Sequence, residues 1–155
     1  MPCVLAPALP QRMPPDHRTR AWYAGLGLTT IALGLGVHLG GSVLPAAVRD
    51  ILGDALWAAM LAWWIGALLP AWPLDRRAAL ALAGCYVVEV SQLLHTPALD
   101  AVRRTQIGHL VLGSGFDARD LLAYAGGVLA AVLIERVWRR SRRAQAATPS
   151  GRTAS

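Results

Sequence analysis

Four long apolar runs limit this chain to very few kinds of fold. Residues 21–39 contain no charged side chain, and further apolar runs cover residues 51–72, 78–94 and 121–137. A bilayer core of about 30 Å requires about 20 helical residues, and each run either has that length or extends to it through its flanks. The runs are rich in Ala, Leu and Gly and lack the period-two alternation of strands. The sequence therefore predicts an all-α integral membrane bundle of four transmembrane helices.

The balance of residue types agrees with this prediction and excludes one large function class. Of the 155 residues, 55% are hydrophobic and only 15% are charged, whereas about 25% are charged in an ordinary globular protein. All 15 basic residues are arginines, and most lie at the chain ends or between the apolar runs. The net charge of +6 is therefore not gathered on a face with interleaved aromatic residues, and we expect no nucleic-acid partner.

The polar ends of the chain set the expected domain limits. Residues 1–20 are rich in proline and basic, residues 139–155 are basic and then rich in small residues, and both are expected to be disordered tails around a membrane domain at residues 21–138. A cleaved signal peptide is the alternative for the first run, but the run is longer than the usual 7–15 apolar residues. The two cysteines, Cys3 and Cys85, are expected to be free thiols.

Arginine placement predicts the orientation. The N-terminal tail, the break after the second run and the C-terminal tail all carry arginines, and a four-helix topology puts all three on one side. The positive-inside rule makes that side the cytoplasm. The other side has Arg49 and an unusually basic last loop with Arg103, Arg104 and Arg119, which we interpret as a hint of function and not of orientation. We therefore expect a multi-pass protein of the bacterial cytoplasmic (inner) membrane with both termini inside.

Three carboxylates fall at a similar depth in this topology. Asp54 lies about one turn inside the second helix, Glu89 lies about two turns before the end of the third, and Asp120 opens the fourth. A carboxylate within a bilayer must be paired, protonated or hydrated, and it usually faces the bundle interior. Gln92 shares a helix face with Glu89. We expect these residues to surround one polar pocket in the outer leaflet, although an anchoring role for Glu89 is an alternative.

The loop at residues 96–119 is expected to be partly ordered. Thr96 followed by Pro97 is a typical helix start and predicts a short helix at residues 97–104. Residues 107–116 are apolar, punctuated by glycine and too short to span, which suits a short helical or re-entrant segment. Arg103 and Arg104 are the obvious cationic partners for Glu89.

Asp120 has two interpretations. Asp117 and Asp120 have the spacing of a capping box, which would make Asp120 a helix-capping residue. Alternatively, Asp120, Tyr124 and Gly127 share one helix face that lines the pocket, with the glycine allowing a neighbouring helix to pack closely. The candidate ligand-binding residues are Asp54, Gln92, Arg103, Arg104 and Tyr124.

Catalytic chemistry has only weak support in the sequence. Glu89, Asp120 and His109 are the candidate catalytic residues, with a carboxylate as general base and the histidine as acid. A lone histidine is also compatible with a structural hydrogen bond. The spacings match no metal-ligand, nucleophile or nucleotide-binding motif, and no metal or cofactor is expected.

The order of the polar segments resembles a known family. Gly53-Asp54-Ala55-Leu56-Trp57, Glu89-Val90-Ser91-Gln92, Gly108-His109-Leu110 and Asp120-Leu121-Leu122-Ala123-Tyr124 occur in sequence, as in the bacterial membrane proteins called domain of unknown function 2809. The chain is more distantly similar to VanZ-like proteins, which carry Glu-x-x-Gln on one helix and Asp, then Gly, on a later one. VanZ-like proteins are linked to glycopeptide resistance, and they have asparagine where this chain has Tyr124. The resemblance implies the membrane topology and a polar site, but no particular reaction.

Three functions follow as expectations. In the favoured one, the outer-leaflet pocket binds an anionic envelope lipid or its headgroup, with Arg103, Arg104 and His109 holding a phosphate or carboxylate. In the second, the protein is a membrane enzyme acting on such a lipid. In the third, it is a structural or assembly protein whose polar residues only join the helices.

Overall fold

The chain folds into helices of two lengths. The structure is a computed structural model and describes residues 17–40, 44–112 and 115–147. These parts contain helices and no strand, which confirms the all-α prediction. The helices are α1 (His17–Leu39), α2 (Ala46–Leu68), α3 (Leu74–Ser91), α4 (Pro97–Arg103), α5 (Gln106–Leu112) and α6 (Ala118–Ala147).

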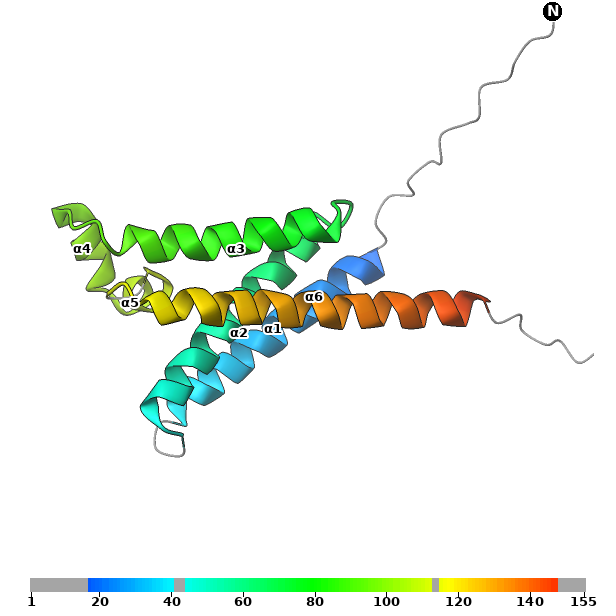
Figure 1. Cartoon of the computed structure of the whole chain (residues 1–155), viewed down its shortest axis with the longest axis horizontal. Coiled ribbons are helices and arrows are strands. Elements are labelled where there is room, and N and C mark those ends of the chain that lie inside the picture. Colours follow the sequence, from blue (N-terminus) through cyan, green and yellow to red (C-terminus); the bar gives the residue numbers. More distant parts are fainter. Residues whose placement is uncertain (1–16, 41–43, 113–114, 148–155) are drawn as a thin grey trace, which may run out of the picture.

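Helix α2 is the centre of the bundle, because it packs against α1, α3 and α6. Figure 1 shows α1 and α2 as an antiparallel pair that crosses the pair formed by α3 and α6. The two short helices α4 and α5 lie together at one end, where α3 finishes and α6 begins (Figure 1). The four long helices therefore alternate in direction, as a chain that repeatedly crosses a layer must do.

Prolines fix the turn between α2 and α3. Pro70 has no N–H to donate to the helix, so α2 ends just before it, with the Leu69 N–H bonded to the Ile65 carbonyl at 2.8 Å. Pro73 stands at the N-cap of α3 with an extended backbone. The turn is therefore short, and it brings the start of α3 back alongside α2.

Small residues line the contacts between the long helices. Ala58 on α2, Ala81 on α3 and Ala131 on α6 are almost completely buried. Gly127 on α6 lies so close to α2 that an added Cβ would stand 2.0 Å from the carbonyl oxygen of Ala55. This confirms the predicted role of that glycine in close helix packing, an arrangement typical of membrane helices.

Three helices suggest a membrane-embedded protein. His17–Leu39, Ala46–Leu68 and Ala118–Gln145 are long and apolar enough to cross a bilayer. Large apolar side chains on their outer faces are exposed, including Leu28, Leu122 and Leu129. The predicted count of four is confirmed for these three only. Helix α3 is shorter, and its 18 residues include four charged ones: Asp75, Arg76, Arg77 and Glu89.

The helix limits also differ from the predicted domain limits. Helix α1 begins at His17 rather than at Ala21, within the segment 1–20 that was expected to be a tail. Helix α6 continues to Ala147, within the segment 139–155 that was expected to be a tail. Charged side chains such as Arg139 ended the apolar run, but arginine is a good helix former and does not end the helix. The remainder of both predicted tails lies outside the described residues.

Candidate functional site

Glu89 is the most deeply buried carboxylate in the part of the chain that the structure describes. It lies in the last turn of α3 and has no exposed surface. Its Oε1 accepts a hydrogen bond from the backbone N–H of Asp117 at 2.8 Å. Its Oε2 accepts bonds from the Tyr124 hydroxyl at 3.1 Å and from the Gln92 amide at 3.1 Å. Both oxygens are thus satisfied by donors, as a buried carboxylate requires.

These bonds fasten the start of α6 to the end of α3. An orphan N–H at the beginning of a helix needs an acceptor, and Glu89 supplies it across the bundle. The predicted capping box is therefore only half correct: the Asp117 carboxylate caps the Arg119 N–H at 2.9 Å, but Glu89, not Asp120, accepts from the Asp117 N–H. The Asp120 carboxyl group is left available for another role.

A cavity of about 500 Å³ opens beside this junction. Its polar wall includes Asp54 from α2, Gln92 from the end of α3, and Asp120 and Tyr124 from α6. The Asp54 and Asp120 carboxyl groups both line the cavity and lie close enough to interact electrostatically. Two carboxyl groups that lie close together repel each other when both are ionised, so a proton or a cation at the pair would stabilise them.

The cavity also has an apolar side. Helix α1 contributes Ile31 and Leu35, and α2 contributes Trp57 and Met60. The cavity therefore has a polar side and a hydrocarbon side, and it lies between helices that are themselves apolar on their outer faces. Such a lining suits a molecule with a small polar group and an apolar body.

The structure brings together five of the eight residues singled out in the sequence. Asp54, Gln92, Asp120 and Tyr124 line the cavity, and Glu89 is bonded to two of them. Their convergence follows from helices of alternating direction, each of which carries its polar residue near the same end. The depth argument predicted the polar pocket, but it did not predict every hydrogen-bond partner of the residues in it.

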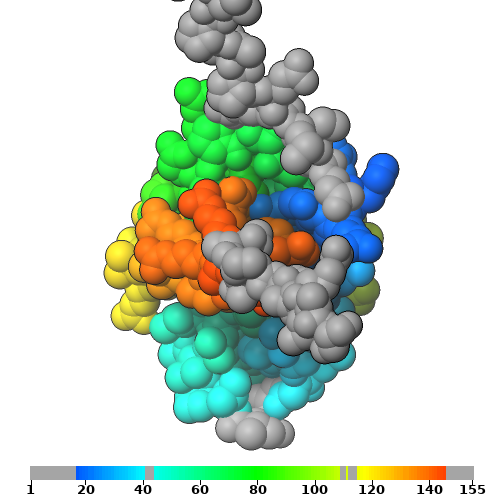
Figure 2. All heavy atoms as spheres, turned by 90° about the vertical axis from the view of Figure 1, so that its right-hand side faces the viewer, coloured from blue at the N-terminus to red at the C-terminus, as the bar shows by residue number. Residues whose placement is uncertain are grey.

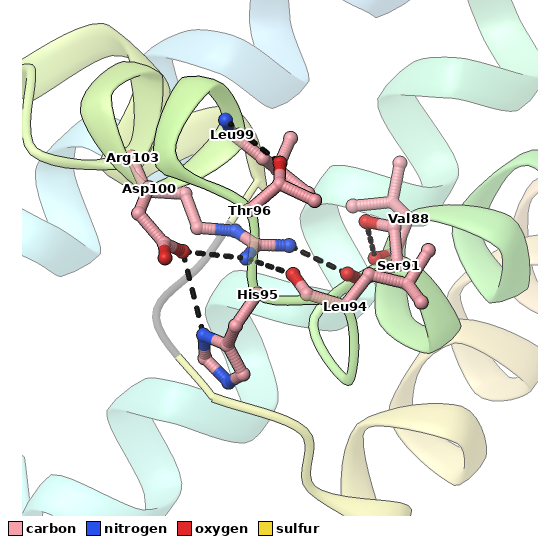
Figure 3. A network of polar contacts seen from close by, with 8 residues as sticks. All are labelled: Val88, Ser91, Leu94, His95, Thr96, Leu99, Asp100 and Arg103. Carbon is pink, nitrogen blue, oxygen red and sulfur yellow. Dashed lines mark hydrogen bonds and ion pairs between the residues drawn. The ribbon is translucent and has the colours of Figure 1, made fainter.

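Arg103 lies elsewhere and has a different task. Its guanidinium donates to the carbonyl oxygens of Ser91 at 2.6 Å and Leu94 at 2.8 Å, and it contacts Asp100 at 3.4 Å. Asp100 in turn contacts His95 (Figure 3). Figure 3 shows the guanidinium pointing at the end of α3, where unpaired carbonyls and the negative end of the helix dipole attract a cation. Arg103 therefore joins α4 to α3 and does not pair with Glu89.

The other two predicted residues are Arg104 and His109. Arg104 is exposed at the C-cap of α4 and is not among the lining residues. His109 is within α5, but its side chain lies outside what the structure describes. The Thr96 cap that begins α4 is confirmed, since the Thr96 hydroxyl accepts from the Leu99 N–H at 3.3 Å.

A second buried polar cluster, which the sequence interpretation missed, lies at the opposite end of the bundle. Glu135 on α6 is 2% exposed and pairs with the equally buried Arg77 of α3. The same Glu135 oxygen accepts from the Tyr23 hydroxyl at 2.8 Å and from Arg139 Nε at 2.8 Å. The four-residue spacing of Glu135 and Arg139, typical of a helical ion pair, was the available signal.

Aromatic rings cover this cluster. Trp22 on α1 stacks on Trp138 of α6 with ring centroids 4.0 Å apart, and Arg142 lies over the Trp138 ring at 5.1 Å. Figure 2 looks onto this end of the molecule and shows α6 (orange) beside the start of α1 (blue), with α3 (green) next to both. The two ends of the bundle are thus built differently, with paired opposite charges here and mostly carboxyl groups at the cavity.

The family of this chain is given by its central part. The model of the family described as "Protein of unknown function (DUF2809)" matches residues 43–128, more than half of the 155 residues. The chain belongs to this family. The match contains Asp54, Glu89, Gln92, Asp120 and Tyr124, so the polar wall of the cavity lies within the DUF2809 region. Tyr23 and Glu135 lie outside it. No solved structure matches the chain significantly.

Proposed function

We propose that this DUF2809 protein crosses the membrane four times and binds the headgroup of an envelope lipid in the cavity between α1, α2, α3 and α6. The topology would place both termini in the cytoplasm of a bacterial cell and the cavity near the outer surface of the inner membrane. The charge distribution supports this orientation, because the arginines at the start of α3 and at the end of α6 lie at the end opposite the cavity: Arg76, Arg77, Arg139, Arg140, Arg142 and Arg143.

The environment of α3 supports a fourth span. Two of its charged residues, Arg77 and Glu89, are buried in the bundle, paired or hydrogen-bonded to other helices. Its outward side chains Leu80, Val87 and Val90 are exposed and apolar. A helix of 18 residues is about 27 Å long, close to the bilayer core. Paired charges that face the bundle interior are compatible with a membrane location.

The two-sided lining of the cavity is the observation that carries the binding proposal. A lipid headgroup is polar and remains attached to hydrocarbon, and the cavity offers carboxyl and amide groups on one side and Ile31, Leu35 and Met60 on the other. The headgroup was expected to be anionic because of Arg103 and Arg104. Since Arg103 binds the end of α3, the binding proposal rests on the cavity itself and not on these arginines.

A cavity-filling variant tests the proposal. Gly34 lines the cavity, and an added Cβ there meets nothing within 4 Å, so Gly34→Phe is expected to occupy the space without disturbing the helix. Gly36 is the matched control, because it also has free space but does not line the cavity. Native mass spectrometry of the purified protein should show co-purified lipid on the wild type and on Gly36→Phe, and loss of it on Gly34→Phe. Equal lipid retention by all three proteins would refute lipid binding in this cavity.

A membrane enzyme is the second candidate, and the Asp54–Asp120 pair favours it. Two neighbouring carboxyl groups can act as general acid and general base on one substrate when one of them is protonated. Glu89 is a poorer catalytic group, because its oxygens are already engaged by three donors. If the protein is an enzyme, wild type incubated with an envelope lipid extract should yield a new lipid product that Asp120→Asn, correctly folded, does not form. Absence of any wild-type product would leave binding without catalysis.

A further inference from the structure

The charges that line the cavity are predominantly negative. Asp50, Asp54, Asp117 and Asp120 contribute carboxyl groups, whereas Arg49 and His38 are the basic residues among the described lining residues. Arg49 lies 3.9 Å from the Asp50 carboxylate at the mouth of the cavity, so its charge is balanced locally.

The Gln92 side chain supplies a second, independent observation. Gln92 is only 6% exposed, lines the cavity and donates its amide N–H to Glu89. Its Oε1 has no hydrogen-bond partner among the described residues. A buried acceptor without a donor is costly, and a ligand with N–H groups would satisfy it. An anionic ligand would instead bring further acceptors to a wall that already has too few donors.

The donor arrangement is unsuited to a chelated metal ion. No three His, Cys, Asp or Glu side chains in residues 17–40, 44–112 and 115–147 converge closely enough to hold one. An organic ammonium has less demanding geometry, since it needs only acceptors around its N–H groups and tolerates an aromatic ring beside it. Trp57 lines the same cavity.

We infer that the cavity recognises an amphiphile that carries a primary ammonium group, held by the Asp54–Asp120 carboxyl pair and Gln92 Oε1, with its hydrocarbon against Ile31, Leu35 and Met60. This inference rests on the proposed function and specifies the chemical class of the headgroup. The ammonium would occupy the carboxyl-rich wall and neutralise part of its charge, and the apolar wall explains why a free amine is expected to be a poorer ligand than one attached to a chain.

Four probe molecules test the contributions of the ammonium group and of the hydrocarbon chain separately. The full chain, purified in nanodiscs made of choline lipids, is titrated with dodecylamine, dodecanol, dodecanoate and ethanolamine, and ligand occupancy is followed by native mass spectrometry. Dodecylamine is expected to bind at least tenfold more tightly than dodecanol or dodecanoate, which have the same chain without an ammonium. Ethanolamine is expected to bind at least tenfold more weakly than dodecylamine, because it lacks the chain.

Variants assign the binding to the cavity. Asp54→Asn and Asp120→Asn are expected to weaken dodecylamine binding at least tenfold, whereas Arg104→Ala, which removes an exposed charge outside the cavity, should leave it unchanged. Equal or tighter binding of dodecanoate to the wild type would overturn the inference, as would displacement of dodecylamine by millimolar Ca²⁺ or Mg²⁺. The comparison of ligands on the wild type requires no variant to fold.

Different results would refute the lipid-binding proposal and the ammonium assignment. If Gly34→Phe retains all co-purified lipid, the proposed lipid site is wrong, whatever the probes show. A different outcome would affect only the ammonium assignment. If Gly34→Phe loses its lipid but the wild type prefers dodecanoate, or binds dodecylamine, dodecanol and dodecanoate equally, lipid binding stands and only the ammonium assignment is wrong. Tight binding of ethanolamine alone, without an advantage for dodecylamine, would also overturn the assignment to an amphiphile.

Discussion

Removal of the Glu89 carboxylate is expected to destabilise the bundle more than its single position in α3 suggests. Glu89→Leu keeps a side chain of similar size but leaves three donors without an acceptor: the Asp117 N–H, the Tyr124 hydroxyl and the Gln92 amide. A stranded buried donor costs about 1–3 kcal/mol. Tyr124 and Gln92 line the cavity, where water can replace part of the loss, so the expected total is near the lower limit, about 3–5 kcal/mol.

Glu89→Gln is the informative comparison, because glutamine can rebuild most of these bonds. Its amide oxygen can accept from the Asp117 N–H. Its amide nitrogen can donate to the Tyr124 oxygen and, after the Gln92 amide turns over, to Gln92 Oε1, which has no partner in the described chain. The expected cost is then about 1 kcal/mol, from exchanging charged hydrogen bonds for neutral ones.

Cys85 provides the assay. Its thiol is free and fully buried beside Tyr124 in the core, so a thiol-reactive fluorophore reports its exposure on heating. The measurement uses a Cys3→Ser background, which leaves Cys85 as the reporting thiol. At about 2–4 °C per kcal/mol for a chain of this size, Glu89→Leu should lower Tm by about 6–20 °C and Glu89→Gln by about 2–4 °C.

Two results would refute this reasoning. A Tm for Glu89→Leu within 2 °C of the parent protein would mean that the three hydrogen bonds contribute nothing that water does not replace. A loss for Glu89→Gln as large as that for Glu89→Leu would mean that the negative charge, and not the supply of acceptors, stabilises the start of α6.

Three further perturbations test other parts of the structure. Gly127→Ala should lower Tm through a clash costing about 1–3 kcal/mol, because its Cβ would meet α2, whereas Gly126→Ala has free space and should be neutral or stabilising; equal effects would contradict the close packing. Arg103→Ala should cost about 2 kcal/mol by freeing carbonyls of α3 and should raise hydrogen exchange in residues 91–95, while the exposed Arg104→Ala should not. Glu135→Leu should cost about 3–5 kcal/mol by leaving a buried arginine unpaired, and an unchanged thermal midpoint would contradict that pairing.

The depth of each polar residue along its helix was predictable from the sequence, and these depths were enough to predict a polar pocket. Asp54, Glu89 and Asp120 each lie a short distance from a turn, and helices of alternating direction bring those turns to one end of the bundle. Rotation about the helix axis was predictable only in part. Glu89 and Gln92 share a face through their spacing, but which neighbour that face meets depends on how α3 and α6 pack together.

The partners of the charged residues were the least predictable feature. Arg103 was expected at Glu89 because opposite charges attract, yet the structure satisfies each of them with backbone groups, the carbonyls of α3 for the arginine and the Asp117 N–H for the glutamate. Arg77 was interpreted as a marker of orientation, although it is buried against Glu135. A linear sequence gives the charge of a side chain but not the unpaired backbone groups that compete for it at helix ends.

The difference between the two polar clusters is the strongest physical reason to assign a ligand to one of them. At the end that holds Glu135, Arg77 and Arg139 surround a single carboxylate, so its charge is compensated within the protein. At the cavity, Asp54 and Asp120 face each other and Gln92 presents a further acceptor without a donor. Negative groups in an apolar layer must obtain a proton or a cation, and a cationic headgroup bound at the Asp54–Asp120 pair would supply the cation.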